Sequence, residues 1–268
     1  MELLWIVILA GYAICVAQSV LALTTRRPLM QRTSLVALGV AFGAHTAWLV
    51  IKGIRANRCP LVGTEEMSSF LSWSLVVSYL IASRWYRAAA LKTFVFPIVL
   101  ALATIAAISP DMQGGERAVN QPLQDVLLPV HVGLILLAYA AFFITFGAGL
   151  MYIIQERELK NKRFGTIFYR LPSLDTCDSI GSRSMAIGFV LLTLGILAGL
   201  WFTHARYGVY WQGGPLEIFS IATWVIYLLL IQTRVTAGWG GRTGALASIV
   251  SFLIVVCSLV GVRYLGHG

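Results

Sequence analysis

Two of the four histidines in this 268-residue chain lie inside long apolar stretches. An ionisable side chain in such a stretch suggests a functional role. These are His45, in "FGAHTAWLV", and His131, in "LLPVHVGLI"; His204 and His267 follow later apolar stretches. A neutral imidazole is a common ligand of transition metals, so the pattern favours a metal or metal-cofactor site. The alternative for either histidine within an apolar stretch is a hydrogen bond to a carbonyl of a neighbouring helix.

A short segment between two apolar runs carries an unusual number of flat rings. It reads "HARYGVYWQGGPLE", residues 204–217, and its rings include Tyr207, Tyr210 and Trp211. The two glycines and the proline that follow keep the backbone irregular, which exposes ring faces that a planar apolar ligand would contact. Trp and Tyr also anchor membrane proteins at the lipid headgroups, and this interpretation stands beside the ligand hypothesis.

The composition defines the elements that must position these side chains. Hydrophobic residues make up 58% of the chain and charged residues 12%, and the mean hydropathy is +0.81. About 20 apolar residues cross a bilayer as a helix, so we predict an all-α, polytopic membrane helix bundle. The polar interval near 155–183 is too short for a separate soluble core, which predicts one membrane domain over residues 1–268. The eight expected spans lie near residues 3–23, 34–52, 67–83, 91–109, 127–154, 184–203, 217–233 and 244–264.

Basic residues collect in alternate loops, which predicts that both termini face outward and that the basic loops are cytoplasmic. The loop after the second predicted span, with Lys52, Arg55 and Arg58, argues against this orientation. The net charge of +9 then reflects topology and attraction to anionic lipid rather than nucleic-acid binding. The residues that set the orientation are Arg26, Arg27, Arg32, Arg84, Arg87, Lys92, Arg157, Lys160, Lys162, Arg163, Arg170, Arg183, Arg234 and Arg242.

Several classes of function lack a motif in the sequence. The four cysteines fall at different membrane levels and include no CxxC pair, and neither a P-loop nor GxGxxG occurs, so thiol redox and nucleotide sites are not indicated. We expect no acidic residue to be buried in a predicted span, which argues against a proton-coupled transporter.

The predicted depths of two histidines favour a haem. His131 lies about four residues inside the outer end of its span and His45 about seven, or about 6 and 10 Å at roughly 1.5 Å per residue. Two imidazoles at similar depth are suited to the axial positions of a haem iron. The depths therefore favour a haem in the outer half of the membrane, with His131 and His45 as its ligands. His204 and His267 are better placed for a superficial haem.

Four consecutive stretches carry a family resemblance over nearly the whole chain. They are "FGAHTAWLVIKG", "CPLVGTEEMSSFLSWSLVVSYL", "LLPVHVGLILLAYAAFFITFGAGLMYII" and "LPSLDTCDSIGSRSMAIGFVLLTLGILAGLWF". They resemble the haem-handling cytochrome c assembly superfamily, whose members include CcsA (ResC), CcmC, CcmF and the small HemX- and YpjD-like proteins. The resemblance implies a multi-pass protein of the bacterial cytoplasmic membrane with haem as its ligand.

The aromatic segment resembles the family's outer loop but departs from it. The family pattern "WGxxWxWDPKE" reads "YGVYWQGGPLE" here, so that Gly213 and Gly214 replace a Trp and an Asp. By resemblance His131 falls on the first outer haem ligand, whereas His267 is out of register with the second. A further membrane histidine of the family is replaced by Gln232. These losses are similar to the HemX- and YpjD-like branch, in which His45 and His131 would be kept.

The resemblance leaves two functions open. The first is delivery or export of haem during cytochrome c biogenesis, with an assembly partner or apocytochrome c outside and with at most a component's part in haem attachment. The second is regulation of haem synthesis through a cytoplasmic partner at the level of glutamyl-tRNA reductase, with or without bound haem. In the first, Arg206 and Arg263 would bind haem propionates. In the second, the partner would meet the basic inner loop of Arg157, Lys160, Lys162 and Arg163.

Overall fold

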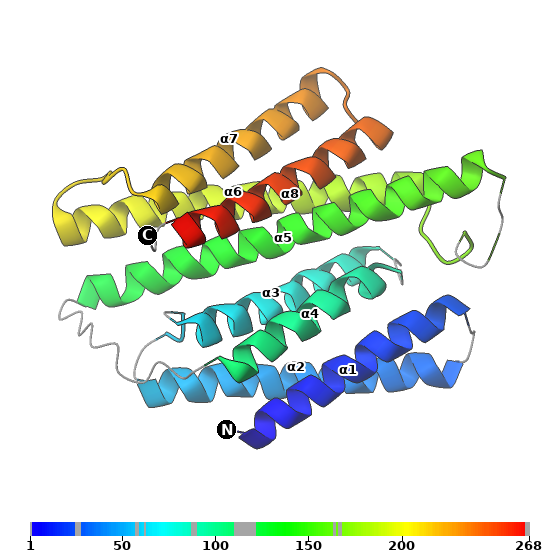
Figure 1. Cartoon of the computed structure of the whole chain (residues 1–268), viewed down its shortest axis with the longest axis horizontal. Helices are drawn as coiled ribbons and strands as arrows, with labels where there is room; N and C mark the ends of the chain where they lie inside the picture. Colours follow the sequence, from blue (N-terminus) through cyan, green and yellow to red (C-terminus); the bar gives the residue numbers. More distant parts are fainter. Residues whose placement is uncertain are drawn as a thin grey trace. The chain divides into compact units, whose positions relative to one another are not determined.

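A computed structural model describes the backbone of most of the chain. The described residues are 2–24, 28–56, 59–61, 63–86, 90–109, 122–162, 165 and 168–265, with side chains except at 22–24, 28–32, 122–125 and 258–265. In this part of the chain all regular secondary structure is helical (Figure 1). The predicted all-α fold is therefore confirmed.

The chain divides into two compact units, described here separately. Unit 1 contains Met1–Arg117 and Arg157–Pro172, and unit 2 contains Ala118–Glu156 and Ser173–Gly268. The helices of unit 1 are α1 (Glu2–Thr24), α2 (Pro28–Ala56), α3 (Thr64–Trp85) and α4 (Leu91–Ile108). Those of unit 2 are α5 (Pro122–Lys160), whose last residues belong to unit 1, α6 (Leu174–Tyr207), α7 (Pro215–Thr236) and α8 (Gly241–Leu265).

Each of the eight predicted spans corresponds to one of these helices. Among the described residues six helices, α1, α2, α4, α5, α6 and α7, are long and apolar enough to cross a membrane. The searched part of α8, Gly241–Cys257, is apolar but shorter, and α3 does not reach the required apolarity. A polytopic membrane protein follows from these helices, whereas the outward position of the termini and the single-domain organisation stay predictions.

Several polar side chains of α3 lie in the interior of unit 1. Ser69, Ser72 and Ser74 are buried, and the Ser72 hydroxyl donates to the Val99 carbonyl of α4 at 2.9 Å. Hydroxyls that bond between helices stabilise membrane bundles without a contribution from the hydrophobic effect. Helix α3 therefore packs against α4 through polar as well as apolar contacts.

The interior of unit 1 also holds charge, which the sequence did not predict. The predicted third span begins at residue 67, but α3 begins at Thr64 and carries Glu65 and Glu66 in its first turn, both buried. Lys52 Nζ lies 2.8 Å from Glu65 Oε2. The predicted span, residues 67–83, therefore left these two carboxylates in the preceding loop, whereas they belong to the first turn of α3. The Lys52 charge is neutralised by this pair, which removes part of its conflict with the predicted orientation.

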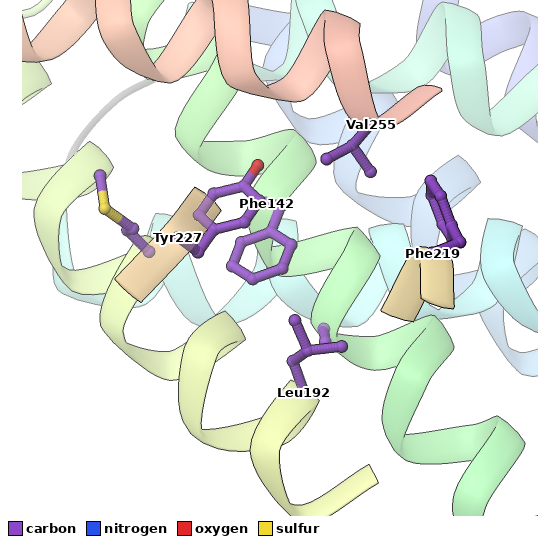
Figure 2. Packing of buried hydrophobic residues seen from close by; sticks show 7 residues of the cluster. Phe142, Leu192, Phe219, Tyr227 and Val255 are labelled. Atoms are coloured by element: carbon purple, nitrogen blue, oxygen red, sulfur yellow. The ribbon is translucent and has the colours of Figure 1, made fainter. Parts of the chain in front are cut away.

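Unit 2 is held together by an aromatic and aliphatic core. The rings of Phe142 from α5 and Tyr227 from α7 stack with centroids 3.5 Å apart (Figure 2). Leu192, Phe219 and Val255 belong to the same buried cluster, so side chains from all four helices of the unit meet there. These side chains fill the interior of the unit, so that the helices pack in one arrangement.

Glycines bring the backbones of unit 2 close together. A Cβ added at Gly188 of α6 would meet the Phe142 ring at 2.6 Å, and one at Gly149 of α5 would meet the Ala245 carbonyl of α8 at 3.0 Å. Small residues at helix contacts are typical of membrane bundles, because packing there depends on close approach of the backbones.

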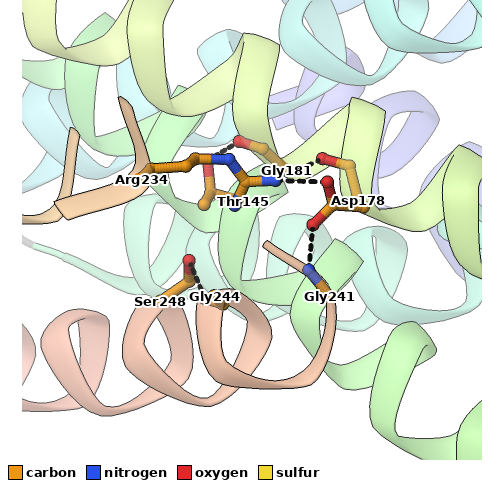
Figure 3. A network of polar contacts seen from close by, with 7 residues as sticks. All are labelled: Thr145, Asp178, Gly181, Arg234, Gly241, Gly244 and Ser248. Atoms are coloured by element: carbon orange, nitrogen blue, oxygen red, sulfur yellow. Dashed lines mark hydrogen bonds and ion pairs between the residues drawn. The ribbon is translucent and has the colours of Figure 1, made fainter. Parts of the chain in front are cut away.

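A polar network closes the end of unit 2 at which α6 and α8 begin (Figure 3). Arg234, in the last turn of α7, forms an ion pair with Asp178 of α6, and the Gly241 N–H donates to Asp178 Oδ1 at 3.0 Å. One carboxylate therefore holds α6, α7 and the start of α8 together. Asp178 lies inside α6, before the start of the predicted sixth span, so this carboxylate too was missed as part of a spanning helix.

Candidate functional site

A cavity of about 210 Å³ opens in unit 2 at the end opposite the Asp178 network. Its wall is mostly apolar and comes from α5, α6, the aromatic segment (residues 204–217) and α7. The residues of the wall that matter for the argument are His131, Gly199, Thr203, Trp211 and Glu217. The structure thus brings together His131 and Trp211, two of the site residues predicted from the sequence.

His131 is held by α6 in one orientation. Its Nδ1 lies 2.7 Å from the Gly195 carbonyl oxygen. A carbonyl only accepts hydrogen bonds, so Nδ1 carries the proton and donates it, and Nε2 presents a lone pair when the imidazole is neutral. Within the described residues Nε2 has no hydrogen-bond partner. This is the arrangement in which metal-binding histidines are usually found, with the second nitrogen fixed by a carbonyl.

Gly199 makes room for the imidazole. A Cβ at this position would lie 2.6 Å from both Cε1 and Nδ1 of His131, closer than real Cβ contacts. Gly195, which supplies the carbonyl, lies one turn earlier on the same face of α6, and a Cβ there would meet the Ile135 side chain at 2.9 Å. The two glycines therefore form the surface on which His131 packs.

The aromatic segment begins where α6 ends and runs to the start of α7. Helix α6 ends at Tyr207 with Gly208 in the left-handed conformation, φ 74°, which glycine adopts without steric cost. Pro215 opens α7 at the first helical turn, where its missing N–H costs no hydrogen bond. Both helix ends are thus encoded locally, and they leave residues 208–214 irregular as predicted.

The predicted rings of this segment are exposed, as a platform for a ligand requires. Tyr210 and Trp211 are 60% and 46% exposed. The His204 ring stacks on Tyr210 with centroids 4.1 Å apart, and the Arg206 guanidinium lies 5.7 Å from the centre of the Tyr207 ring. Trp211 is the ring that enters the cavity wall, whereas His204, Tyr207 and Tyr210 lie outside it.

Glu217 is a residue of the site that the sequence analysis did not select. It lies in the first turn of α7, and its Oε2 accepts hydrogen bonds from the backbone N–H groups of Gln212, Gly213 and Gly214 at 3.0, 2.8 and 3.3 Å. The sequence did contain a signal: a carboxylate three residues after a helix N-cap is the second half of a capping box. The additional reach to Gln212 and Gly213 needed the coordinates.

His45 lies in unit 1, fully buried between α1, α2 and α3. The Tyr12 hydroxyl lies 3.0 Å from Nδ1, and the Ser69 hydroxyl lies 2.9 Å from Nε2. Both ring nitrogens therefore have hydroxyl partners, and binding of a metal at either one requires the loss of a hydrogen bond. The Trp5 ring, with its centroid 6.0 Å from that of His45, completes the surroundings.

Some predicted residues cannot be placed. His267 and Arg163 lie outside the described residues, and the side chain of Arg263 is not described although its backbone belongs to α8. Gln232, which replaces the family's membrane histidine in the sequence comparison, is exposed on α7.

The residues around the cavity are compatible with a haem. The wall supplies an imidazole nitrogen with a free lone pair, an indole and aliphatic side chains, which suit iron and the apolar macrocycle respectively. Pockets for organic ligands usually measure about 300–1,000 Å³, so a macrocycle would extend beyond this cavity onto neighbouring surface. The exposed rings of the aromatic segment adjoin it through Trp211.

Comparison with known proteins identifies the family of the chain. The chain is 26% identical over 261 residues to the cytochrome c biogenesis protein CcsA of Synechococcus sp. (strain CC9605), covering 88% of this chain and 86% of that one. It is 27% identical to CcsA of Prochlorococcus marinus (strain MIT 9215), covering 83% and 79%, and 26% identical to CcsA of Gloeothece citriformis (strain PCC 7424), covering 90% and 87%. The family model described as cytochrome c assembly protein matches residues 61–268. With its aromatic segment and His131 inside the matched region, the chain belongs to the cytochrome c assembly protein family.

Proposed function

We propose that this protein handles haem during cytochrome c biogenesis, by binding b-type haem at the cavity of unit 2 with His131 as an axial ligand. The observation that carries the proposal is His131 itself. Its Nδ1 donates to the Gly195 carbonyl, and its Nε2 has no hydrogen-bond partner among the residues that the structure describes. The residue lines a largely apolar cavity together with Trp211. A bound haem would supply an iron that takes two axial ligands in such a protein.

The protein's own residues would orient and shield the ligand. The Gly195 carbonyl would keep the imidazole in one tautomer, and Gly199 would hold its ring plane. Trp211 and the exposed ring of Tyr210, its neighbour in the chain, would support the apolar face or edge of the macrocycle. Arg206, beside the Tyr207 ring, is in the same segment and would pair with a propionate carboxylate.

The second axial ligand is proposed in the order that the sequence suggested, His45 first and then His204 or His267. For His45 to bind iron through Nε2, the bond to Ser69 must be released while Tyr12 keeps its contact with Nδ1. For His204 to bind, its ring must leave Tyr210. His204 follows Thr203, a residue of the cavity wall, in the same unit as His131, and this supports keeping it in the test.

Delivery is favoured over regulation of haem synthesis because the similar proteins reported above carry the name cytochrome c biogenesis protein. Under this proposal the partners are haem, the lipid bilayer and an assembly partner or apocytochrome c on the outer side of a bacterial cytoplasmic membrane. Membership of the HemX- and YpjD-like branch stays a prediction.

The test is the absorption spectrum of the full-length protein, purified in detergent after expression with added haem, oxidised and then reduced with dithionite. We expect a sharp α-band in the reduced parent and its loss in His131→Ala. Loss of the band in His45→Ala but not in His204→Ala would identify His45 as the second ligand, and the reverse pattern would identify His204.

A matched control distinguishes lost ligation from lost folding. Gln232→Ala alters a polar side chain on the exposed surface of α7 in the same unit and is expected to keep the spectrum of the parent. Each variant is compared by its thermal unfolding midpoint. A parent that binds no haem, or a His131→Ala variant with an unchanged α-band, would overturn the proposal.

A further inference from the structure

One carboxylate oxygen organises the backbone of the aromatic segment. Glu217 Oε2 accepts from three successive N–H groups, those of Gln212, Gly213 and Gly214. Hydrogen bonds to a charged acceptor are about twice as strong as those between neutral groups. In the described part of the chain, no other side chain donates to or accepts from the backbone of residues 209–214.

These bonds exceed what capping of α7 requires. In a capping box the carboxylate at the third helical position accepts only from the N–H of the N-cap residue, which is Gly214 here. The bonds to Gln212 and Gly213 instead hold the two residues that precede the cap, and they bend the chain around the carboxylate. Gly213 adopts φ 73° in this bend, a conformation that L-residues with a side chain rarely take. The bend is thus specified by a glycine and a carboxylate together.

The bend begins at the residue that enters the cavity. Trp211 directly precedes Gln212, and both Trp211 and Glu217 line the cavity that contains His131. Fixing residues 212–214 therefore fixes the backbone from which the indole projects. A ligand-binding loop that is already ordered costs less conformational entropy on binding than one that must be ordered by its ligand.

We propose that Glu217 is a positioning residue. It orders the backbone of the aromatic segment before a ligand binds and so holds Trp211 at the His131 cavity. The inference rests on the proposed haem site, and it adds a residue that acts through the loop and not through contact with iron. Glu217→Ala removes the acceptor for all three N–H groups. Glu217→Gln keeps a side-chain carbonyl of the same length that accepts hydrogen bonds, without the charge.

Two measurements on the full-length protein in detergent test this role. Amide hydrogen exchange of residues 208–217 without haem reports the loop, and haem titration followed at the α-band reports the site. For Glu217→Ala we expect exchange at residues 212–214 to rise about tenfold or more and haem affinity to fall on the order of tenfold. For Glu217→Gln we expect both values to return to within about threefold of the parent.

Two further variants keep the test decisive. Asp175→Ala removes an exposed carboxylate from the first turn of α6 and is expected to change neither measurement. If Glu217→Ala does not fold, Gly213→Ala takes its place in the test. It leaves Glu217 in place but strains the bend, so it should also raise amide exchange at residues 212–214 and lower haem affinity.

The outcomes separate this inference from the proposed function. If Glu217→Ala loosens the loop but binds haem like the parent, the carboxylate is only a helix cap and the inference is wrong. Unchanged exchange would also overturn it. If the parent binds no haem, the proposed function fails and the role toward haem fails with it, while the exchange measurement still decides whether Glu217 orders the loop.

Discussion

At the scale of the single residue, the orientation of one imidazole ring depends on the absence of side chains beside it. Gly199→Val would place carbon atoms within about 2.6 Å of the His131 ring, so the imidazole must turn away from Gly195. We expect the reduced α-band to be lost or strongly weakened while the helices still form. Spectra of the variant and its helical circular dichroism measure both effects.

The matched control for this substitution is Gly39→Val on α2, where an added Cβ meets nothing within 4 Å. It makes the same chemical change in unit 1 and should leave the α-band unaltered. Equal loss of haem in both variants would show that valine in any spanning helix disturbs the protein, and the specific role of Gly199 would be wrong.

Tyr12 offers a second test at this scale. Tyr12→Phe removes the hydroxyl beside His45 Nδ1 and leaves a fully buried ring nitrogen without that partner. We expect a loss of about 1–3 kcal/mol in the free energy of unfolding, because a buried polar atom is left unsatisfied. The loss is measured by denaturant titration in mixed micelles, with the exposed Tyr169→Phe as the control, for which no change is expected.

At the scale of the element, the buried pair of α2 and α3 makes a prediction with a built-in control. Lys52→Met removes the ammonium that pairs with the buried Glu65 carboxylate, and breaking a buried ion pair on one side costs about 3–5 kcal/mol. The double variant Lys52→Met, Glu65→Leu removes both charges and should regain most of this loss. Unfolding free energies of the parent, Lys52→Met, Glu65→Leu and the double variant give the coupling between the residues. A double variant as unstable as the sum of its parts would contradict the pairing.

Apolar runs predicted the helices well, because about 20 apolar residues have few alternatives in a membrane. They failed where a helix continues with polar residues. Helix α3 begins three residues before its predicted span, with Glu65 buried beside Lys52, and α6 begins ten residues before its own, with Asp178 paired to Arg234. A hydropathy pattern counts these residues as loop, since it does not contain the partner that neutralises them.

The candidate site was predictable only in part, because a sequence pattern shows residue types and local turns but not the contacts between distant helices. The residue types and the glycine- and proline-containing segment indicated His131 and Trp211, and the structure places both in one cavity wall. The sequence did not show that Gly195 and Gly199 form the surface for His131, because that contact joins positions 64 residues apart. It also did not show that both nitrogens of His45 are occupied by hydroxyls from two other helices.

At the scale of the whole molecule, the orientation predicted from the basic loops can be measured directly. An alkaline phosphatase, active only outside the cytoplasm, is fused after residue 268 or within the segment between α5 and α6. We expect activity from the first fusion and none from the second, because the basic loops stay inside. The opposite result would place the aromatic segment and the His131 cavity on the cytoplasmic side and would contradict delivery to an outer partner.

Helix α5 is also far longer than the membrane requires. Its 39 residues rise about 58 Å at roughly 1.5 Å each, nearly twice a hydrocarbon thickness of about 30 Å. A tilt of about 20° would shorten this height by only a few ångströms. Part of the helix therefore lies beyond the lipid tails, and its last turn carries the exposed Arg157 and Lys160. A protein that binds these two charges would contact a rigid helix end, and would lose less conformational entropy than in binding the same charges on a loop that samples many positions.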